Sequence, residues 1–299
     1  MRMSCIRIVL TALIVTLIPL NVSAQSAFSS NRSMKSKDLR SMIMKGSNTT
    51  YFKLLEMLFP DLQLDPNQPA AGIAHRTIPL RHMTENVEPE ALAGNFALTD
   101  FEERWITSNG HRVLLLHLDL SAEGANGGTP YEGESTVLAA FTVEPVAKLL
   151  DAMDIKTDRF TGFLEGHPVF RLNAQNDAFV VNSTHWNAGE SYNDVSVLFL
   201  DGNRFKTVTT LFLLDTQGCG ATFNQTPFFR AAPRAASKYP NIIVRVQLKK
   251  EADEKECTRP TPGYTRYYQA VFSWNGTKGE YQGNARQLRA LDKFNRGRL

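Results

Sequence analysis

The segment from Asn182 to Asp194 gathers more chemically useful side chains than any other part of the chain. It reads NSTHWNAGESYND and lies between two apolar runs, Ala178–Val181 and Val195–Leu200. This arrangement predicts a polar loop or strand end between two strands. The side chains of interest are an imidazole, an amide, a carboxylate and two aromatic rings, namely His185, Asn187, Glu190, Trp186 and Tyr192.

These groups suit a carbohydrate or peptide site. His185 and Glu190 could relay a proton as a catalytic pair, while Trp186, Asn187 and Tyr192 would bind the ligand, with Trp186 stacking on a sugar face. The alternative is structural, with Trp186 in the core and His185 hydrogen-bonded to backbone. The sequence favours this alternative, because one loop supplies no second catalytic group that can be placed nearby.

Two weaker candidate groups lie earlier in the chain. His117 and Asp119 are two residues apart on a predicted strand, so they point the same way and could share a proton or a metal; the flanking leucines favour a half-buried structural histidine instead. Glu102 and Glu103 precede Trp105, which could act as a sugar platform. Adjacent strand residues face opposite ways, so only one of these carboxylates can serve any one pocket.

The familiar catalytic and metal-binding motifs do not occur. The chain has no Gly-x-Ser-x-Gly elbow, no phosphate-binding Gly-x-x-x-x-Gly-Lys loop, no His-Glu-x-x-His pair and no calcium loop. Asp151, Asp154 and Asp158 lack the close oxygen spacing and the glycine turn of a calcium site, which indicates a helix end. We therefore expect neither a metal nor a cofactor.

Residues 1–24 have the three parts of a cleavable signal peptide. A positive start is followed by the apolar run Ile8–Leu20, and small residues at Val22 and Ala24 predict cleavage after Ala24. The run is about 13 residues long, whereas a membrane-spanning helix needs about 20, so an uncleaved anchor is the weaker alternative. We expect a periplasmic or secreted protein with no integral membrane segment after cleavage.

Cysteine usage agrees with export. Cleavage removes Cys5 and leaves Cys219 and Cys257, a pair that an oxidising compartment favours as a disulfide. A metal site is rejected, because no His or carboxylate ligand lies beside Cys219 and only Glu254 and Glu256 lie beside Cys257. Closing a loop of this length would stabilise the fold by roughly 3–4 kcal/mol on a chain-entropy model.

The charge balance excludes one class of partner. The chain holds 33 basic and 30 acidic residues, and the mature chain is near neutral, which argues against a nucleic-acid partner. The charge is uneven: residues 25–50 and 284–299 are basic, whereas residues 85–134 hold ten acidic groups and two arginines. Basic ends could contact an anionic membrane or polymer, but solvated tails are the favoured interpretation.

Helices are expected in four places. A short one is centred on Ser36–Met44. Thr50 is a plausible N-cap for a second over Tyr51–Phe59, which Pro60 ends. A third would run from Glu144 or Pro145 to about Met153, with apolar residues at helical spacing. The fourth closes the chain over Asn284–Phe294.

Strands dominate the remainder. The strongest is Arg112–Leu120, apolar on one face and mixed on the other, and Asp201-Gly202-Asn203 is a clear hairpin turn. Further strands are expected at His75–His82, Ser135–Val143, Val195–Leu200, Phe205–Leu214, Asn241–Lys249, Thr265–Trp274 and Gly279–Gln282.

These elements indicate a β-rich α+β fold of antiparallel sheets, sandwich-like or curved and open, with helices near the N-terminus, mid-chain and at the C-terminus. Residues 25–50 would be a mobile basic leader, and residues 51–299 a globular domain that could divide near 145–165. We expect an exported binding module for an envelope protein or polymer. The alternative is a hydrolase of an envelope polymer, with its site around His185.

Overall fold

The structure is a computed structural model of the whole chain. It describes residues 38–44, 48–64, 72–83, 88–98, 101–122, 135–157, 160–187, 190–218, 221–235, 237–252 and 262–298, all within one compact unit spanning residues 34–299. The signal peptide, most of the basic leader and both Cys219 and Cys257 lie outside the described residues, so the expectations about them stay predictions. No described helix is long and apolar enough to cross a membrane.

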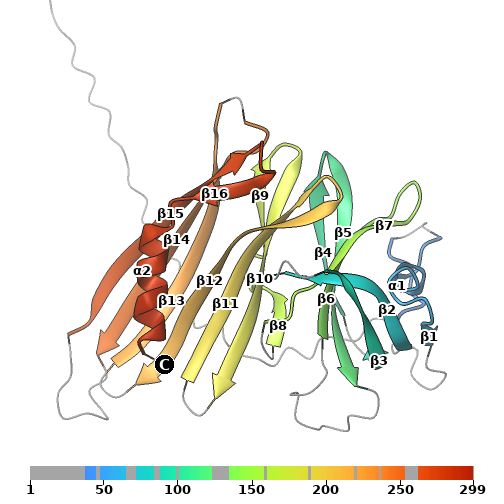
Figure 1. The fold of residues 1–299 in the computed structure, drawn as a ribbon, viewed down its shortest axis with the longest axis horizontal. Helices are drawn as coiled ribbons and strands as arrows, with labels where there is room; N and C mark the ends of the chain where they lie inside the picture. Colours follow the sequence, from blue (N-terminus) through green and yellow to red (C-terminus); the bar gives the residue numbers. More distant parts are fainter. Residues whose placement is uncertain are drawn as a thin grey trace, which may run out of the picture. The chain divides into compact units, whose positions relative to one another are not determined.

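Strands make up most of the described chain, and they form two sheets (Figure 1). The first is seven-stranded, in the order β1-β2-β3-β5-β6-β7 with β4 on β5, and it is antiparallel except where β2 and β7 pair in parallel. Its strands are β1 (Gln63–Leu64), β2 (Gly72–His82), β3 (Glu90–Leu98), β4 (Phe101–Ser108), β5 (His111–Ala122), β6 (Ser135–Thr142) and β7 (Lys148–Asp154).

The second sheet is nine-stranded and antiparallel, in the order β16-β15-β14-β13-β12-β11-β10-β8, with β9 also on β10. Its strands are β8 (Phe160–Phe163), β9 (Val169–Asn173), β10 (Asn176–Asn187), β11 (Glu190–Asp201), β12 (Arg204–Gly218), β13 (Ala221–Ala232), β14 (Asn241–Ala252), β15 (Tyr264–Asn275) and β16 (Glu280–Gly283). The expectation of a β-rich fold of antiparallel sheets is confirmed.

Strand β5 contributes to two different cores because leucine side chains lie on both of its faces. Leu114 and Leu116 pack in a core with Leu54 of helix α1 (Tyr51–Leu55), whereas Leu115, one residue along, packs with Phe179 of β10 in a core shared by the two sheets. The alternation predicted for Arg112–Leu120 is therefore confirmed.

The nine-stranded sheet folds back on itself around a third core. Phe170 of β9 stacks on Phe229 of β13 with ring centroids 6.1 Å apart. Helix α2 (Arg286–Arg296) buries Leu288 and Leu291 in the same core. The buried Asn295 donates a hydrogen bond of 2.6 Å to the carbonyl oxygen of Phe212, which satisfies a strand oxygen beneath the helix.

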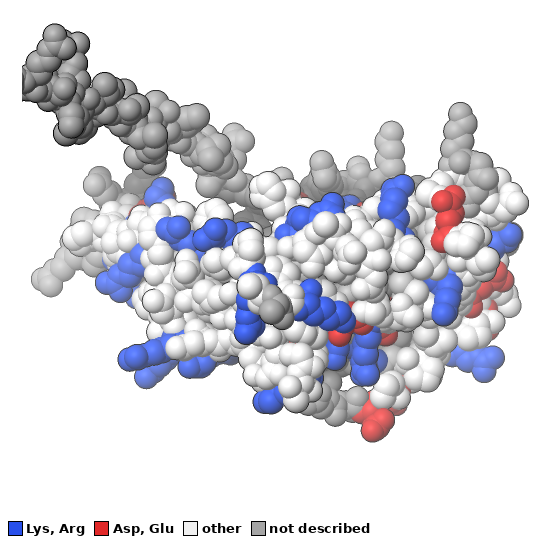
Figure 2. Space-filling view, turned by 90° about the horizontal axis from the view of Figure 1, so that it is seen from above, with Lys and Arg blue, Asp and Glu red and all other residues white. Residues whose placement is uncertain are grey.

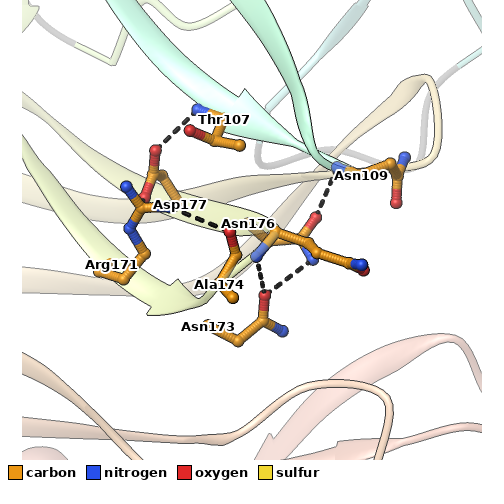
Figure 3. A network of polar contacts seen from close by, with 8 residues as sticks. Thr107, Asn109, Arg171, Asn173, Ala174, Asn176 and Asp177 are labelled. Carbon is orange, nitrogen blue, oxygen red and sulfur yellow. Dashed lines mark hydrogen bonds and ion pairs between the residues drawn. The ribbon is translucent and has the colours of Figure 1, made fainter.

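One junction between the two sheets is a polar network at two facing turns (Figure 3). The backbone N–H of Thr107 on β4 donates to the carboxylate of Asp177 on β10 at 2.7 Å, and Arg171 forms an ion pair with the same carboxylate at 3.1 Å. Asn109 donates its N–H to the side chain of Asn176 at 3.0 Å. These contacts tie the β4–β5 turn to the β9–β10 turn.

A second junction involves Asp151. Its carboxylate accepts the N–H of Phe205 on β12 at 2.7 Å and pairs with Arg81 of β2, which also donates to the carbonyl oxygen of Phe205 at 3.1 Å. Asp151 therefore links the two sheets and lies in strand β7. The sequence had indicated a helix end at this residue, and that expectation is wrong.

The mid-chain helix expected over Glu144–Met153 is wrong, because residues 148–154 form strand β7. The apolar spacing fits a helical face, yet Val146 is 72% exposed and Met153 is buried opposite Leu138 of β6. Pairing with two neighbouring strands outweighs the local helical pattern here.

The other expected helices fare differently. Helix α1 begins where predicted, and the Thr50 hydroxyl accepts the N–H of Lys53 at 3.3 Å as an N-cap, but the helix ends at Leu55 and does not reach Phe59. Helix α2 overlaps the predicted C-terminal helix. Residues 38–44 form turns and a single bridge between Met42 and Thr50, so the described part of the first expected helix is not helical.

Candidate functional site

The segment predicted as a polar loop is instead the tip of a β-hairpin. Strands β10 and β11 continue through it, pairing His185 with Tyr192 and Asn187 with Glu190. The loop expectation is therefore wrong over residues 182–187 and 190–194. Polar residues occupy both faces of this hairpin, so the apolar alternation that marks most strands is missing from the sequence.

The hairpin places the His185 ring in an aromatic stack. It lies parallel to Tyr192 with centroids 4.5 Å apart, and Tyr192 packs on Phe212 of β12 at 4.9 Å. The guanidinium of Arg296 in α2 lies 4.6 Å from the centre of the Phe212 ring. Cross-strand aromatic pairs of this kind stabilise a sheet.

The structure thus brings together two of the five predicted site residues, His185 and Tyr192. For Trp186, Asn187 and Glu190 it describes the strand backbone but not the side chains. A proton relay between His185 and Glu190, and the hydrolase that it would serve, stay predictions.

His117 and Asp119 lie on one face of β5, as predicted. His117 is buried, and its Nε2 atom lies 3.7 Å from an Asp119 oxygen while making no hydrogen bond to the described residues. The Asp119 side chain is 64% exposed, and the His117 ring packs edge-on against Phe163 at 6.2 Å. Among the described residues, no three or more His, Cys, Asp or Glu side chains gather in a metal-binding group.

Glu102 and Glu103 face opposite sides of β4, also as predicted. Glu103 accepts a hydrogen bond from the Tyr51 hydroxyl of α1. Burial, that hydrogen bond and the Glu103 charge together raise the pKa of Tyr51 above its usual value. Glu102 pairs with Arg104. Both carboxylates therefore make structural contacts.

A more promising surface is the outer face of β13, β14 and β15, which the sequence analysis did not nominate. Along β14 the side chains of Val244 and Val246 are buried, so Arg245 points to the other side of the sheet. The register sets Arg245 between Phe228 of β13 and Gln269 of β15, on the same face. Phe228 is 49% exposed although it is a large apolar side chain.

A hollow of about 480 Å³ lies on this face, which we call the β13–β15 face. Its lining residues are Phe228, Phe229, Arg230, Ile243, Arg245, Gln247, Tyr267 and Gln269. The Arg245 guanidinium lies 3.9 Å from the centre of the Tyr267 ring, which is itself 52% exposed. Neither Arg230 nor Arg245 forms an ion pair within the described part of the chain.

The near-neutral total charge conceals a strong polarity. Residues 204–299 hold 17 Lys and Arg against 7 Asp and Glu, whereas residues 25–203 hold 14 against 23. In Figure 2 Lys and Arg side chains are spread over the whole visible face, including the end of the molecule that carries β13–β16 and α2, whereas the visible Asp and Glu side chains gather toward the other end. The hollow therefore lies in the basic half of the protein.

Comparison of the chain with protein-family models, curated proteins and solved structures gave no match.

Proposed function

We propose that the protein is an exported binding module that holds an envelope polymer on its β13–β15 face. The observation that carries the proposal is the hollow, in which exposed aromatic rings lie beside two arginines that form no ion pair with the residues that the structure describes. A volume of about 480 Å³ lies within the range of roughly 300–1,000 Å³ usual for ligand sites.

The exposed aromatic residues support this role. Phe228 and Tyr267 are each about half exposed on a sheet whose opposite face is well packed. Aromatic side chains at these two positions therefore contribute little to the stability of the fold. Tyrosine and arginine are also among the types most enriched among residues that dominate binding energy. Their clustering on one rigid platform favours recognition, since little ordering is needed on binding.

Export is part of the proposal. It rests on the signal peptide predicted at residues 1–24 and on the disulfide predicted between Cys219 and Cys257. The register pairs Ala221 of β13 with Ala252 of β14, so the two connections that contain these cysteines leave the sheet at neighbouring positions. We further propose that the two sheets pack in a sandwich-like manner, supported by the core that they share.

A double substitution tests the binding role. We expect Phe228→Ala with Tyr267→Ala to weaken binding of the mature protein by at least about 10-fold, because each truncation removes a desolvated aromatic contact of about 1 kcal/mol or more. The measurement is retention on immobilised peptidoglycan, lipopolysaccharide, and acidic and neutral polysaccharides, with an apparent Kd for each polymer that binds.

The matched control is Phe160→Ala on β8, which removes a 61% exposed phenylalanine outside the face and should bind as the wild type does. The proposal fails if the double variant retains wild-type affinity for every polymer that the wild-type protein binds, or if the wild-type protein binds none.

A further inference from the structure

We infer that the hollow on the β13–β15 face binds an acidic polysaccharide, with sugar rings against Phe228 and Tyr267 and carboxylates against Arg230 and Arg245. The inference rests on the proposed function and specifies its ligand. Three observations support it: the side chains that line the hollow, the backbone hydrogen bonds of β14, which are already used within the sheet, and the ion pair that limits the positive charge of this face.

The first argument concerns Arg245. The N–H bonds of a guanidinium lie in the plane of the group, so a guanidinium held over an aromatic ring still presents donors at its own edge. Two of these parallel donors match the two oxygens of a carboxylate. The Arg245 guanidinium lies 3.9 Å from the centre of the Tyr267 ring and forms no ion pair with the described residues, so its donors can bind an anion from outside the chain.

The second argument concerns the sheet itself. The backbone of β14 is paired on one side with β13 over Asn241–Ala252 and on the other with β15 over Ile242–Lys250. Its N–H and C=O groups are therefore used in the sheet, and an extended peptide cannot add to it as a further strand. A ligand can be held only by the side chains.

Those side chains suit a sugar. Aromatic faces carry partial negative charge and attract the slightly positive C–H groups on the flat side of a sugar ring. The amides of Gln247 and Gln269 line the same hollow and can both donate to and accept from hydroxyl groups. Rings, amides and guanidinium groups together match a polymer whose units carry an apolar face, hydroxyls and a carboxylate.

The third argument concerns the limits of the positive charge. One step along β14 from Gln247 on the outer face, Lys249 is paired with Glu251. A single-stranded nucleic acid needs a continuous positive track for its backbone, and this pairing interrupts it. Binding to an anionic membrane is favoured by apolar side chains that protrude into the bilayer. Phe228 and Tyr267 instead line a hollow.

The test compares four probes on the mature protein by calorimetry: a polygalacturonate oligomer, a neutral maltooligosaccharide, an oligothymidylate and vesicles of anionic lipid. We expect polygalacturonate to bind most tightly and its affinity to fall as salt is raised. Arg245→Gln should weaken that binding at least about 10-fold, since it removes a charge-assisted pair of hydrogen bonds.

Arg112→Gln is the matched control. The Arg112 guanidinium lies 4.2 Å from the centre of the Trp105 ring, so it too lies over an aromatic ring, but it belongs to the seven-stranded sheet. It should leave polygalacturonate binding unchanged.

The inference is overturned if polygalacturonate binds no better than the maltooligosaccharide, if the oligothymidylate or the vesicles bind more tightly, or if Arg112→Gln weakens binding as much as Arg245→Gln does. The protein could instead bind a ligand of another class tightly and lose that binding in the double variant Phe228→Ala with Tyr267→Ala. This result would overturn the inference and leave the proposed binding function intact.

Discussion

Phe199→Ala is expected to lower the free energy of unfolding by about 3–5 kcal/mol, the usual cost of removing a fully buried phenylalanine ring. Phe199 is completely buried on β11. The rings of Tyr239, Tyr281 and Trp274 meet it edge-on, with centroids 5.1, 5.3 and 5.8 Å away. Truncation leaves a cavity that these large rings cannot fill without leaving their own contacts.

Urea denaturation followed by tryptophan fluorescence measures this effect, because Trp274 lies in the same cluster. Phe160→Ala, the exposed control, should change the free energy of unfolding by no more than about 0.5 kcal/mol. A loss below about 1 kcal/mol for Phe199→Ala would mean that this aromatic cluster is not the packed core described here.

Asp177→Ala is expected to cost about 2–4 kcal/mol. The carboxylate is largely buried and accepts the Thr107 N–H, so its removal leaves that donor without a partner at the junction of the sheets. The Arg171 side chain is 59% exposed, so solvent screens the ion pair and its share of the loss is small.

Asp177→Asn separates these two contributions, because the amide oxygen still accepts the Thr107 N–H while the charge is lost. It should cost less than half as much as Asp177→Ala in the same denaturation experiment. Equal losses for the two variants would show that the ion pair, not the backbone hydrogen bond, holds this junction together.

The β-rich class and most strands could be predicted from sequence because their signals are local. The turn at Asp201-Gly202-Asn203 joins β11 to β12 as expected, with Asp201 opposite Arg204. Asp201 is also partly buried, which opposes its ionisation, yet hydrogen bonds from Lys238 and Tyr239 prevail and hold its pKa below the usual value. The hydrogen bond from Tyr239 to Asp201 joins residues 38 positions apart, so no local pattern in the sequence predicts it.

Where the expectations were wrong, contacts between distant strands decide the structure. Strand β7 carries a helical apolar pattern, but β6 and β2 provide its hydrogen-bond partners. The hairpin at His185 is polar on both faces, so its sequence resembles a loop even though Tyr192 lies directly opposite.

The candidate site escaped the sequence analysis for the same reason. Arg245 and Tyr267 are ordinary residues of two strands that the sequence predicts, and strand β13, which carries Phe228, was not expected. Only the register of β13 on β14 and of β14 on β15 brings them to one face. The total charge also gave no indication of this site, because the near-neutral sum does not show that residues 204–299 are basic.

Hydroxyl-radical footprinting of the mature protein, with and without saturating polygalacturonate, tests ligand binding on the β13–β15 face most directly. Radicals oxidise exposed aromatic rings, so Phe228, Tyr267 and Phe160 should all react in the free protein. We predict that the polymer shields Phe228 and Tyr267 while Phe160 reacts as before. Bound polymer that leaves both Phe228 and Tyr267 as reactive as in the free protein would contradict the account.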